Sequence, residues 1–292
     1  MRTVIIGEVG ECFNGDFNVA LKMIEEIKKA GCDIVKFQLL DLAEVSFDDP
    51  ERDWFQKLEL QSEKIKKLMK HAELYQIGIL FTPVSVKTAS WMYELGCQEV
   101  KIASSFLKKK ELLTYINDHF QTIYISTGMA ALSEIQQTLD QFDRDKDIYI
   151  LHCISEYPTG PLLEQRGLVA MKEEDVHLNM LSILRKTFPK YPIGYSDHTD
   201  GIFVPMMAAA MGAAVIEKHV TLDRQTPIEH FKKGLEYMGT DHVLSIEPEK
   251  LQEMVSQIRR VETIQGNEIW DRSEGEKLLM EFLRQRYREE NG

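Results

Sequence analysis

The chain has 292 residues, of which 43% are hydrophobic and 28% are charged, and its formal net charge is −12. These proportions are typical of a soluble globular protein, and the length suits one α/β domain or two smaller ones. The negative charge argues against binding to a nucleic-acid backbone, although a few lysines or helix N-termini can still attract a small anion.

The sequence contains no targeting or membrane signal. No apolar run approaches the roughly 20 residues that a membrane span needs, and the N-terminal MRTVIIGEV enters a strand without a leader. The four cysteines, Cys12, Cys32, Cys97 and Cys153, lack CxxC spacing, which favours free thiols in a reducing compartment. We therefore expect a cytoplasmic protein with no membrane or nucleic-acid partner. Cys12 and Cys153 are possible nucleophiles by position, but the sequence favours a structural role for both.

Short apolar runs alternate with helical patterns along the chain. Strands are predicted at Thr3–Val9, Asp33–Gln38, 79–83, 99–104, 122–128, 147–153, Ile193–Ser196 and Ala214–Lys218. Helices are predicted at Phe17–Ala30, Ser62–Tyr75, Val86–Leu95, Lys109–Asn117, Ser133–Phe142, Val176–Phe188, Ile202–Met211 and 248–263. Long irregular stretches are predicted at Leu39–Leu60, Ile154–Glu174 and Arg224–Thr240.

Eight strand–helix alternations predict a (β/α)8 barrel in the α/β class. We assign residues 1–264 to a single barrel domain and residues 265–292 to a charged, partly helical tail. A doubly wound open sheet is the alternative, but no GxGxxG or GxxxxGK[ST] motif follows the first strand.

Two histidines end neighbouring predicted strands. His198 follows the seventh strand and His219 ends the eighth, each next to a carboxylate, Asp197 or Glu217. Because parallel strands share one carboxyl edge, the two imidazoles should lie side by side where such sheets bind ligands. The pattern predicts a divalent metal site, with Asp197 orienting the turn or His198 rather than binding the metal. An isolated histidine at a strand end would more often be a surface residue.

Two lysines, Lys36 and Lys101, lie inside apolar strands, where an unpaired cation is costly. Together with several hydroxyls at the strand ends, they indicate an anionic ligand such as a phosphate or carboxylate. The alternative is that the lysines pair with Glu8 and Glu217 inside the barrel, which does not exclude a function.

An ordered set of motifs resembles the sialic acid synthase (NeuB-type N-acetylneuraminate synthase) family. The set consists of GEVGECFNGD, VKFQ, KIAS, ISTGMA, LHCISEYPTG, GYSDHTDGI, IEKHVTLD and DHVLSIEP, and it covers about Thr3 to Thr263. The resemblance implies a transferase that condenses phosphoenolpyruvate with an open-chain amino sugar such as N-acetylmannosamine. The products would be a 2-keto-3-deoxy sugar acid and phosphate.

The resemblance also implies roles for individual residues. The phosphoenolpyruvate contacts would be Lys36, Gln38, Thr82, Lys101, Ser104, Ser126 and Ser196. His198 and His219 would hold Mn²⁺ or Mg²⁺, and the catalytic group would be Glu8, Lys36, Lys101 and Glu217. On the sugar side, the matching positions are Ser155, Tyr157, Phe106 and Asp241.

Departures from the family pattern concentrate on the sugar side. Cys12-Phe13 replaces Asn-His, Phe106 replaces an acidic residue and Ser155 replaces an asparagine, so the acceptor sugar is left open. The family's C-terminal antifreeze-like domain has no counterpart before Gly292. Self-association as a homodimer, or a separate antifreeze-like protein, would be the candidate partners.

Two insertions are expected to rise from the catalytic face. Residues 160–174 and 225–239, with Arg166, His230, Lys232 and Lys233, are hypothesised to form a lid, with a surface loop or dimer contact as the alternative. Two other functions stay open: a metal-dependent sugar isomerase or epimerase, and a non-catalytic sugar-binding subunit.

Overall fold

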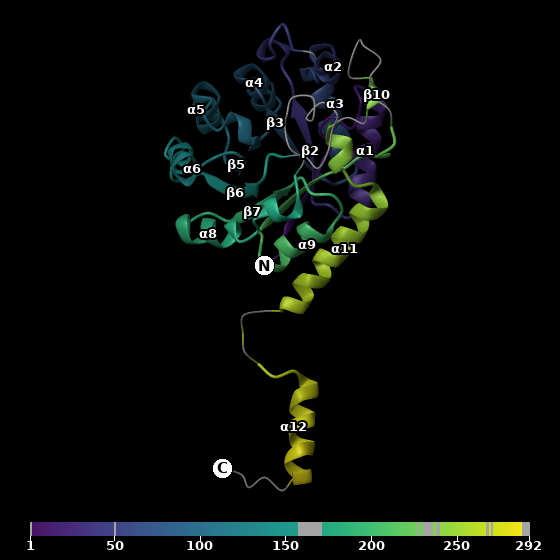
Figure 1. Cartoon of the computed structure of the whole chain (residues 1–292), viewed down its shortest axis with the longest axis vertical. Helices are drawn as coiled ribbons and strands as arrows, with labels where there is room; N and C mark the ends of the chain where they lie inside the picture. Colours follow the sequence, from purple (N-terminus) through teal and green to yellow (C-terminus); the bar gives the residue numbers. More distant parts are fainter. Residues whose placement is uncertain are drawn as a thin grey trace.

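The computed structural model describes residues 2–49, 51–156, 171–226, 228–229, 236–237, 240–266, 269 and 271–287, and Figure 1 shows its arrangement. The N-terminal residues lead directly into the central sheet, and the helices surround this sheet.

Eight parallel strands form the centre of the fold. They are β1 (Val4–Glu8), β2 (Ile34–Leu39), β3 (Gly78–Pro83), β4 (Glu99–Ile102), β5 (Thr122–Ser126), β6 (Asp147–Cys153), β7 (Ile193–Asp197) and β8 (Val215–His219). Their order is β3-β2-β1-β8-β7-β6-β5-β4, and the two terminal strands, β3 and β4, also contact each other. The sheet therefore closes on itself, which confirms the predicted (β/α)8 barrel.

Helices follow the strands and cover the outside of the barrel. The larger ones are α1 (Phe17–Lys29), α3 (Ser62–Leu74), α4 (Val86–Glu94), α5 (Lys110–His119), α6 (Leu132–Leu139), α8 (Met180–Thr187), α9 (Phe203–Ala210) and α11 (Pro248–Gln265). Local caps set where several of them begin. Asp16 accepts a hydrogen bond from the backbone N–H of Asn18 at the start of α1, and Ser85 forms a capping box with Thr88 at the start of α4.

Shorter elements occupy the connections. They are the 3-10 turns η1 (Leu42–Glu44), η2 (Ser104–Phe106) and η3 (Glu173–Val176), the helices α2 (Arg52–Leu58) and α10 (Thr240–Leu244), and the antiparallel pair β9 (Ile228–Glu229) and β10 (Glu236–Tyr237). The prediction that Leu39–Leu60 is a loop was therefore wrong. The sequence between Leu39 and Leu60 has only a short apolar pattern, and α2 is stabilised by burying Trp54 and Leu58 against the barrel.

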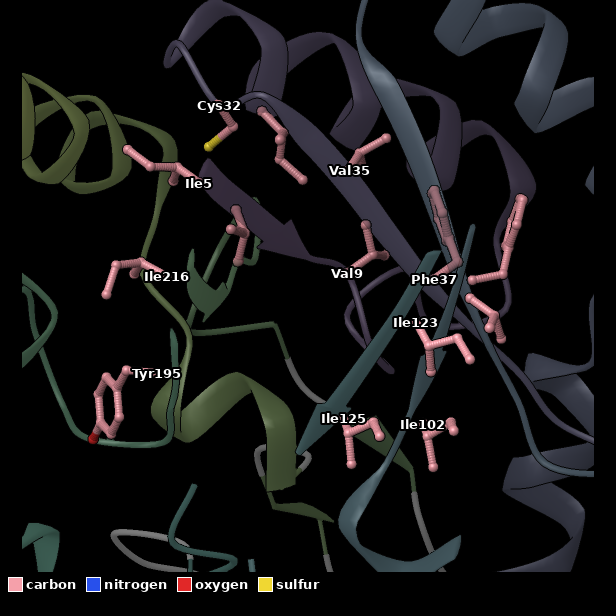
Figure 2. Packing of buried hydrophobic residues seen from close by; sticks show 14 of the residues in the cluster. Ile5, Val9, Cys32, Val35, Phe37, Ile102, Ile123, Ile125, Tyr195 and Ile216 are labelled. Carbon is pink, nitrogen blue, oxygen red and sulfur yellow. The ribbon is translucent and has the colours of Figure 1, made fainter. Parts of the chain in front are cut away.

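The apolar residues form two separate layers. The larger cluster lies between the strands and the surrounding helices, and Figure 2 shows part of it, from Val35 and Phe37 on β2 to Tyr195 on β7 and Ile216 on β8. The smaller cluster fills the inside of the barrel; its buried members are Ile6, Leu80, Tyr124, Leu151 and Val215. Side chains alternate between the two faces of each strand, so the residue two positions beyond each inner apolar residue also points into the barrel.

The C-terminal segment differs from the rest of the chain. Helix α12 (Glu274–Tyr287) buries none of its side chains, and Figure 1 shows it apart from the barrel. Leu278, Leu279 and Phe282 are more than half exposed. No helix in the described part of the chain is long and apolar enough to cross a membrane.

Candidate active site

A layer of buried polar side chains lies directly above the apolar interior of the barrel. The strands β1, β2, β3, β5 and β8 each place a polar residue two positions after an apolar one that fills the barrel. The predicted site residues in this layer are Glu8, Lys36, Thr82, Lys101, Ser126, Ser196 and Glu217, each no more than 3% exposed. The structure thus brings together charged residues that lie up to about 200 positions apart in the sequence.

Both lysines are paired with carboxylates in this layer. Lys36 Nζ lies 2.7 Å from Glu8 Oε2 and donates to Thr82 Oγ1 at 3.1 Å. Lys101 Nζ donates to Ser126 Oγ at 2.7 Å and lies 3.4 Å from Glu217 Oε1. The same Glu217 oxygen lies 3.8 Å from Lys36 Nζ, so two ammonium groups converge on one carboxylate.

Two further side chains complete this network. Ser196 Oγ donates to Glu217 Oε1 at 2.9 Å, and Gln38 Nε2 donates to Glu8 Oε1 at 3.1 Å. The second oxygen of Glu217 is buried and has no hydrogen-bond partner among the described residues. A buried carboxylate oxygen without a partner is costly, which is typical of a site built for a ligand.

The two carboxyl groups experience opposite electrostatic environments. Burial raises the pKa of Glu8, and Lys36 only partly opposes this effect. Burial also acts on Glu217, but Lys101 and Lys36 outweigh it and lower the pKa of that carboxyl. Burial lowers the pKa of Lys101, with Glu217 opposing it. Carboxyl groups with diverging pKa values are a frequent arrangement in acid–base catalysis.

His198 and His219 lie side by side at the same end of the barrel. Their ring centroids are 5.5 Å apart and the rings cross at 60°. His198 donates its Nδ1–H to the carbonyl of Ile154 at 2.8 Å, so its Nε2 carries the lone pair. Burial lowers the pKa of both rings, and it lowers that of His219 well below the usual range. Both shifts favour the neutral imidazole, which is the form that binds metal ions.

The residues around the two histidines fit a divalent ion in part. His219 Nδ1 is buried without a hydrogen-bond partner in the described part of the chain, and it lies 3.6 Å from Asp241 Oδ2. A backbone carbonyl fixes the His198 ring, as carbonyls commonly do for metal-binding histidines. Within the described ranges, no three His, Cys, Asp or Glu side chains are arranged to hold an ion on their own. The two imidazoles could therefore hold an ion only with further ligands from water or substrate.

Asp241 connects this end of the site to the turn after β1. Its Oδ2 accepts the backbone N–H of Glu11 at 2.9 Å, and burial raises its pKa to about 7. Gly10 has a φ of +51°, and a Cβ built on it would lie 2.1 Å from Asp241 Oδ2. The close approach between turn and carboxylate requires glycine at this position.

Of the predicted sugar-side residues, those that the structure describes lie on connections around the polar layer. Ser104 accepts the backbone N–H of Gly128 at 2.9 Å, and a Cβ on Gly128 would lie 2.0 Å from Ser155 Oγ. Ser104, Gly128 and Ser155 therefore form one tight contact between the connections after β4, β5 and β6. Phe106 is half-buried against the outer apolar cluster, with Lys109 Nζ 5.6 Å from its ring centroid. Tyr157 lies outside the described residues.

The remaining predictions concern the cysteines and the residues of the hypothetical lid. Burial raises the pKa of Cys12 well above its usual value and also raises that of Cys153, which does not favour either as a nucleophile. All four cysteines are free. The four residues named for the hypothetical lid, Arg166, His230, Lys232 and Lys233, lie outside the described residues.

Sequence reasoning missed two groups of residues near the site. Glu11 accepts a hydrogen bond from Trp54 Nε1 at 3.2 Å, beside a small cavity of about 20 Å³ that Gln38 also lines. Because α2 was not predicted, Trp54 was not considered. Lys218, between Glu217 and His219, is a third buried lysine and pairs with Asp197 at 2.7 Å. Its position in an apolar strand was a signal of the same kind as that of Lys36.

Comparison with known proteins agrees with this geometry. Residues 23–270 match the NeuB family. An N,N'-diacetyllegionaminic acid synthase of Campylobacter jejuni is 33% identical to this chain. The alignment, with its gaps, is 302 residues long and covers 97% of this chain and 83% of that protein. An uncharacterized protein of Methanocaldococcus jannaschii is 37% identical over 95% of this chain and 74% of its own length.

A solved structure extends the match to three dimensions. The N-acetylneuraminic acid synthetase of Leptospira borgpetersenii, crystallised with citrate, superposes with a TM-score of 0.84 and is 29% identical. The superposition covers 99% of this chain and 94% of the solved one. NeuB-family synthases are phosphoenolpyruvate-dependent transferases that form a C–C bond. The chain therefore belongs to the NeuB family and is a phosphoenolpyruvate-dependent synthase of the nonulosonic acid type.

Proposed function

We propose that this synthase condenses phosphoenolpyruvate with the aldehyde of an N-acetylmannosamine-like or modified acetamido sugar, assisted by Mn²⁺ or Mg²⁺. The observation that carries the proposal is the convergence of Lys36 and Lys101 on Glu217 Oε1 inside the barrel, at 3.8 and 3.4 Å. Two buried ammonium groups with several hydroxyls around them form a pocket suited to a small ligand with several negative charges.

The proposed reaction forms one C–C bond and breaks the C–O bond to phosphate. C3 of phosphoenolpyruvate forms a bond to the aldehyde carbon, the aldehyde oxygen takes a proton, and water adds to C2. The C2–O bond to phosphate then breaks, which releases inorganic phosphate and leaves a 2-keto-3-deoxy acid. In this proposal, Lys36 and Lys101 bind the phosphate and carboxylate of phosphoenolpyruvate. The hydroxyls of Thr82, Ser104, Ser126 and Ser196, with the Gln38 amide, supply the remaining hydrogen bonds.

The two carboxylates have different tasks in this proposal. Glu8, whose pKa is raised by burial, is suited to accept or deliver a proton. Glu217 stays ionised and holds both lysines in place until the substrate arrives. The lysine–carboxylate pairing considered from the sequence is thus compatible with catalysis, because the same contacts keep the cations oriented.

The proposed metal site consists of His198 and His219. A bound divalent ion would act as a Lewis acid on the sugar aldehyde. The chain itself fixes the His198 ring through the Ile154 carbonyl and keeps both imidazoles neutral by burial. Asp241, beside His219, is proposed to face the sugar, together with Ser155, Phe106 and Tyr157.

The acceptor is proposed to be an acetamido sugar of the class used by related synthases. A 33% identical relative is named a diacetyllegionaminic acid synthase, so diacetamido hexoses belong in the test beside N-acetylmannosamine. The substitutions Cys12-Phe13, Phe106 and Ser155 are the positions where this chain would distinguish among such sugars.

The test measures phosphate release from phosphoenolpyruvate with Mn²⁺ against N-acetylmannosamine, 2,4-diacetamido sugars and simple aldoses. We expect release that requires both metal and one class of acetamido sugar, and that is abolished by His198→Ala. His71→Ala, at a helix-surface histidine paired with Glu25, is the matched control and should keep full activity. Turnover of a sugar without phosphoenolpyruvate would instead indicate an isomerase or epimerase. Sugar binding without any turnover would indicate a binding subunit.

A further inference from the structure

The strands that carry the two histidines have a second polar layer on their outer side. On β7 and β8, Ser196 and Glu217 pair in register and point into the site. Asp197 and Lys218 are the next pair in register and therefore point outward, toward the helices. Tyr195, on the same outward side, belongs to the outer apolar cluster. The outward pair is thus surrounded by apolar packing and not by solvent.

Asp197 and Lys218 form an ion pair with no solvent exposure. Lys218 Nζ lies 2.7 Å from Asp197 Oδ2, and both side chains are fully buried. Lys218 also donates to the backbone carbonyl of Thr199. The Asp197 carboxylate accepts from the hydroxyl of Thr199 at 2.8 Å and from its backbone N–H at 3.2 Å. Most polar contacts of the pair are therefore made to the turn after β7, and Asp197 also accepts a hydrogen bond from the Tyr195 hydroxyl on the strand itself.

This turn carries His198, whose position the sheet does not determine. Strand β7 ends at Asp197, so His198 lies outside the strand ladder. Asp197 precedes His198 and Thr199 follows it, and both are tied to Lys218. His219 directly follows Lys218 on β8. The Lys218 side chain thus connects β8, the strand that ends in His219, to the two residues on either side of His198.

A buried ion pair is a poor source of stability, since desolvating its two charges offsets most of their attraction. Its presence at this place needs another reason, and geometric control of the turn is the one that its contacts support. We propose that the Asp197–Lys218 pair positions the two imidazoles and so sets the affinity of the site for divalent metal. This inference rests on the proposed function, because it takes His198 and His219 as the metal ligands.

The experiment measures the Kd of Mn²⁺ by electron paramagnetic resonance, without substrates, together with the thermal unfolding midpoint. Lys218→Met leaves Asp197 buried and unpaired, so it is accompanied by Asp197→Asn/Lys218→Met, which leaves no lone charge and keeps an acceptor for Thr199. We expect the double variant to keep the unfolding midpoint of the wild type and to bind Mn²⁺ about 10- to 100-fold more weakly, as is usual when groups that orient metal ligands are removed.

A second ion pair provides the matched control. Arg259 pairs with Asp33 at 2.8 Å and donates to the carbonyl of Thr3, near the start of β1 and away from the histidines. Arg259→Met should lower the unfolding midpoint and leave the Mn²⁺ Kd unchanged. If the double variant folds and keeps the wild-type Kd while His198→Ala loses Mn²⁺ binding, the positioning role is overturned and the metal site is not. Wild-type Mn²⁺ affinity in His198→Ala would overturn the proposed metal site and this inference with it.

Discussion

At the scale of single residues, the proposed active site is built from charges that are almost completely buried. Glu8, Lys36, Lys101 and Glu217 are each no more than 3% exposed, and each has a partner of opposite charge within 4 Å. Such a group is sensitive to the loss of one member, because the remaining charge stays in a medium that solvates it poorly.

Lys101→Met tests this dependence. The change removes one cation from the proposed phosphoenolpyruvate site and leaves Glu217 with Lys36 alone. We expect the KM for phosphoenolpyruvate to rise at least about tenfold, and the free energy of unfolding to fall by about 3–5 kcal/mol, as when one partner of a buried pair is lost. Steady-state kinetics and chemical denaturation measure the two effects. Lys108→Met, which breaks the exposed pair with Glu134, should leave stability almost unchanged. An unchanged KM in Lys101→Met would count against the binding role.

Asp241 predicts a pH dependence of stability in the metal-free protein. Burial raises its pKa in the folded state to about 7, whereas an unfolded aspartate titrates near 3.9. The folded state then binds the proton more tightly, so the stability contributed by this group is present at acid pH and is lost as the pH rises from about 4 to 7.

Denaturation curves across this pH range, with chelator present, should show a steeper decline in wild type than in Asp241→Asn. The difference in slope is at most about 1.4 kcal/mol per pH unit for one proton. Asp140→Asn, at an exposed carboxylate, is the control and should follow the wild-type curve. Parallel curves for wild type and Asp241→Asn would show that Asp241 titrates normally.

At the scale of elements, the connections after the strands decide the shape of the site. The turn after β1 runs beside α10, where Asp241 lies, and the turns after β4, β5 and β6 meet at Ser104, Gly128 and Ser155. These contacts join segments that are far apart in the chain, and two of them depend on the absence of a Cβ. Small changes in the turns should therefore affect the site more than changes of similar size on the helices.

Gly10→Ala measures this effect. The added methyl would overlap Asp241 Oδ2 and lie 3.1 Å from His219 Nδ1, in addition to the strain of a left-handed backbone. Gly96→Ala is a matched control, because Gly96 has a φ of +87° but a Cβ there would meet nothing within 4 Å. We expect a cost of roughly 1 kcal/mol for Gly96→Ala from backbone strain and a larger cost for Gly10→Ala, with loss of Mn²⁺ binding only in the latter. Equal effects of the two changes on denaturation would argue against the close approach.

At the scale of the whole molecule, the barrel helices and the C-terminal helix differ in how many side chains they bury. Helix α11 buries Leu251, Met254, Val255 and Ile258 and packs against α9 and α1, which closes the ring of helices. Helix α12 buries no side chain, and even its apolar residues Leu278, Leu279 and Phe282 are exposed. We propose, as the sequence suggested, that the barrel is the folding unit and the tail is an appendage.

A chain that ends at Gly266 tests this division. We expect its unfolding midpoint to stay within about 2 °C of the full chain, because no described side chain of α12 contributes to a core. A chain that ends at Glu247 removes α11 as well and should not fold, since each of its four buried side chains contributes about 1.5–3 kcal/mol. Calorimetry measures both. A large loss of stability on removing α12 alone would show that the tail packs on the barrel.

The sequence by itself determined the architecture and the approximate location of the site. Eight short apolar runs separated by helical patterns are compatible with few folds, because parallel strands need crossover helices that cover both faces. In a barrel of parallel strands, the carboxyl ends share one edge, so polar residues such as Lys36, His198 and His219 could be assigned to a common site from their positions alone. The motif resemblance added the family, which the matches to known proteins confirmed.

Only the tertiary structure decided which partner each polar group meets. Which carboxylate pairs with which lysine depends on the register and closure of the barrel, and Cys12 reaches Ser245 across 233 positions of sequence. The same holds for α2, whose seven residues are too few to form a helix without the surface that buries Trp54. The partner of Lys218 also could not be predicted, since the sequence shows a lysine in an apolar strand but not the carboxylate that it meets. Long-range pairing is decided by packing, and packing exists only in the folded molecule.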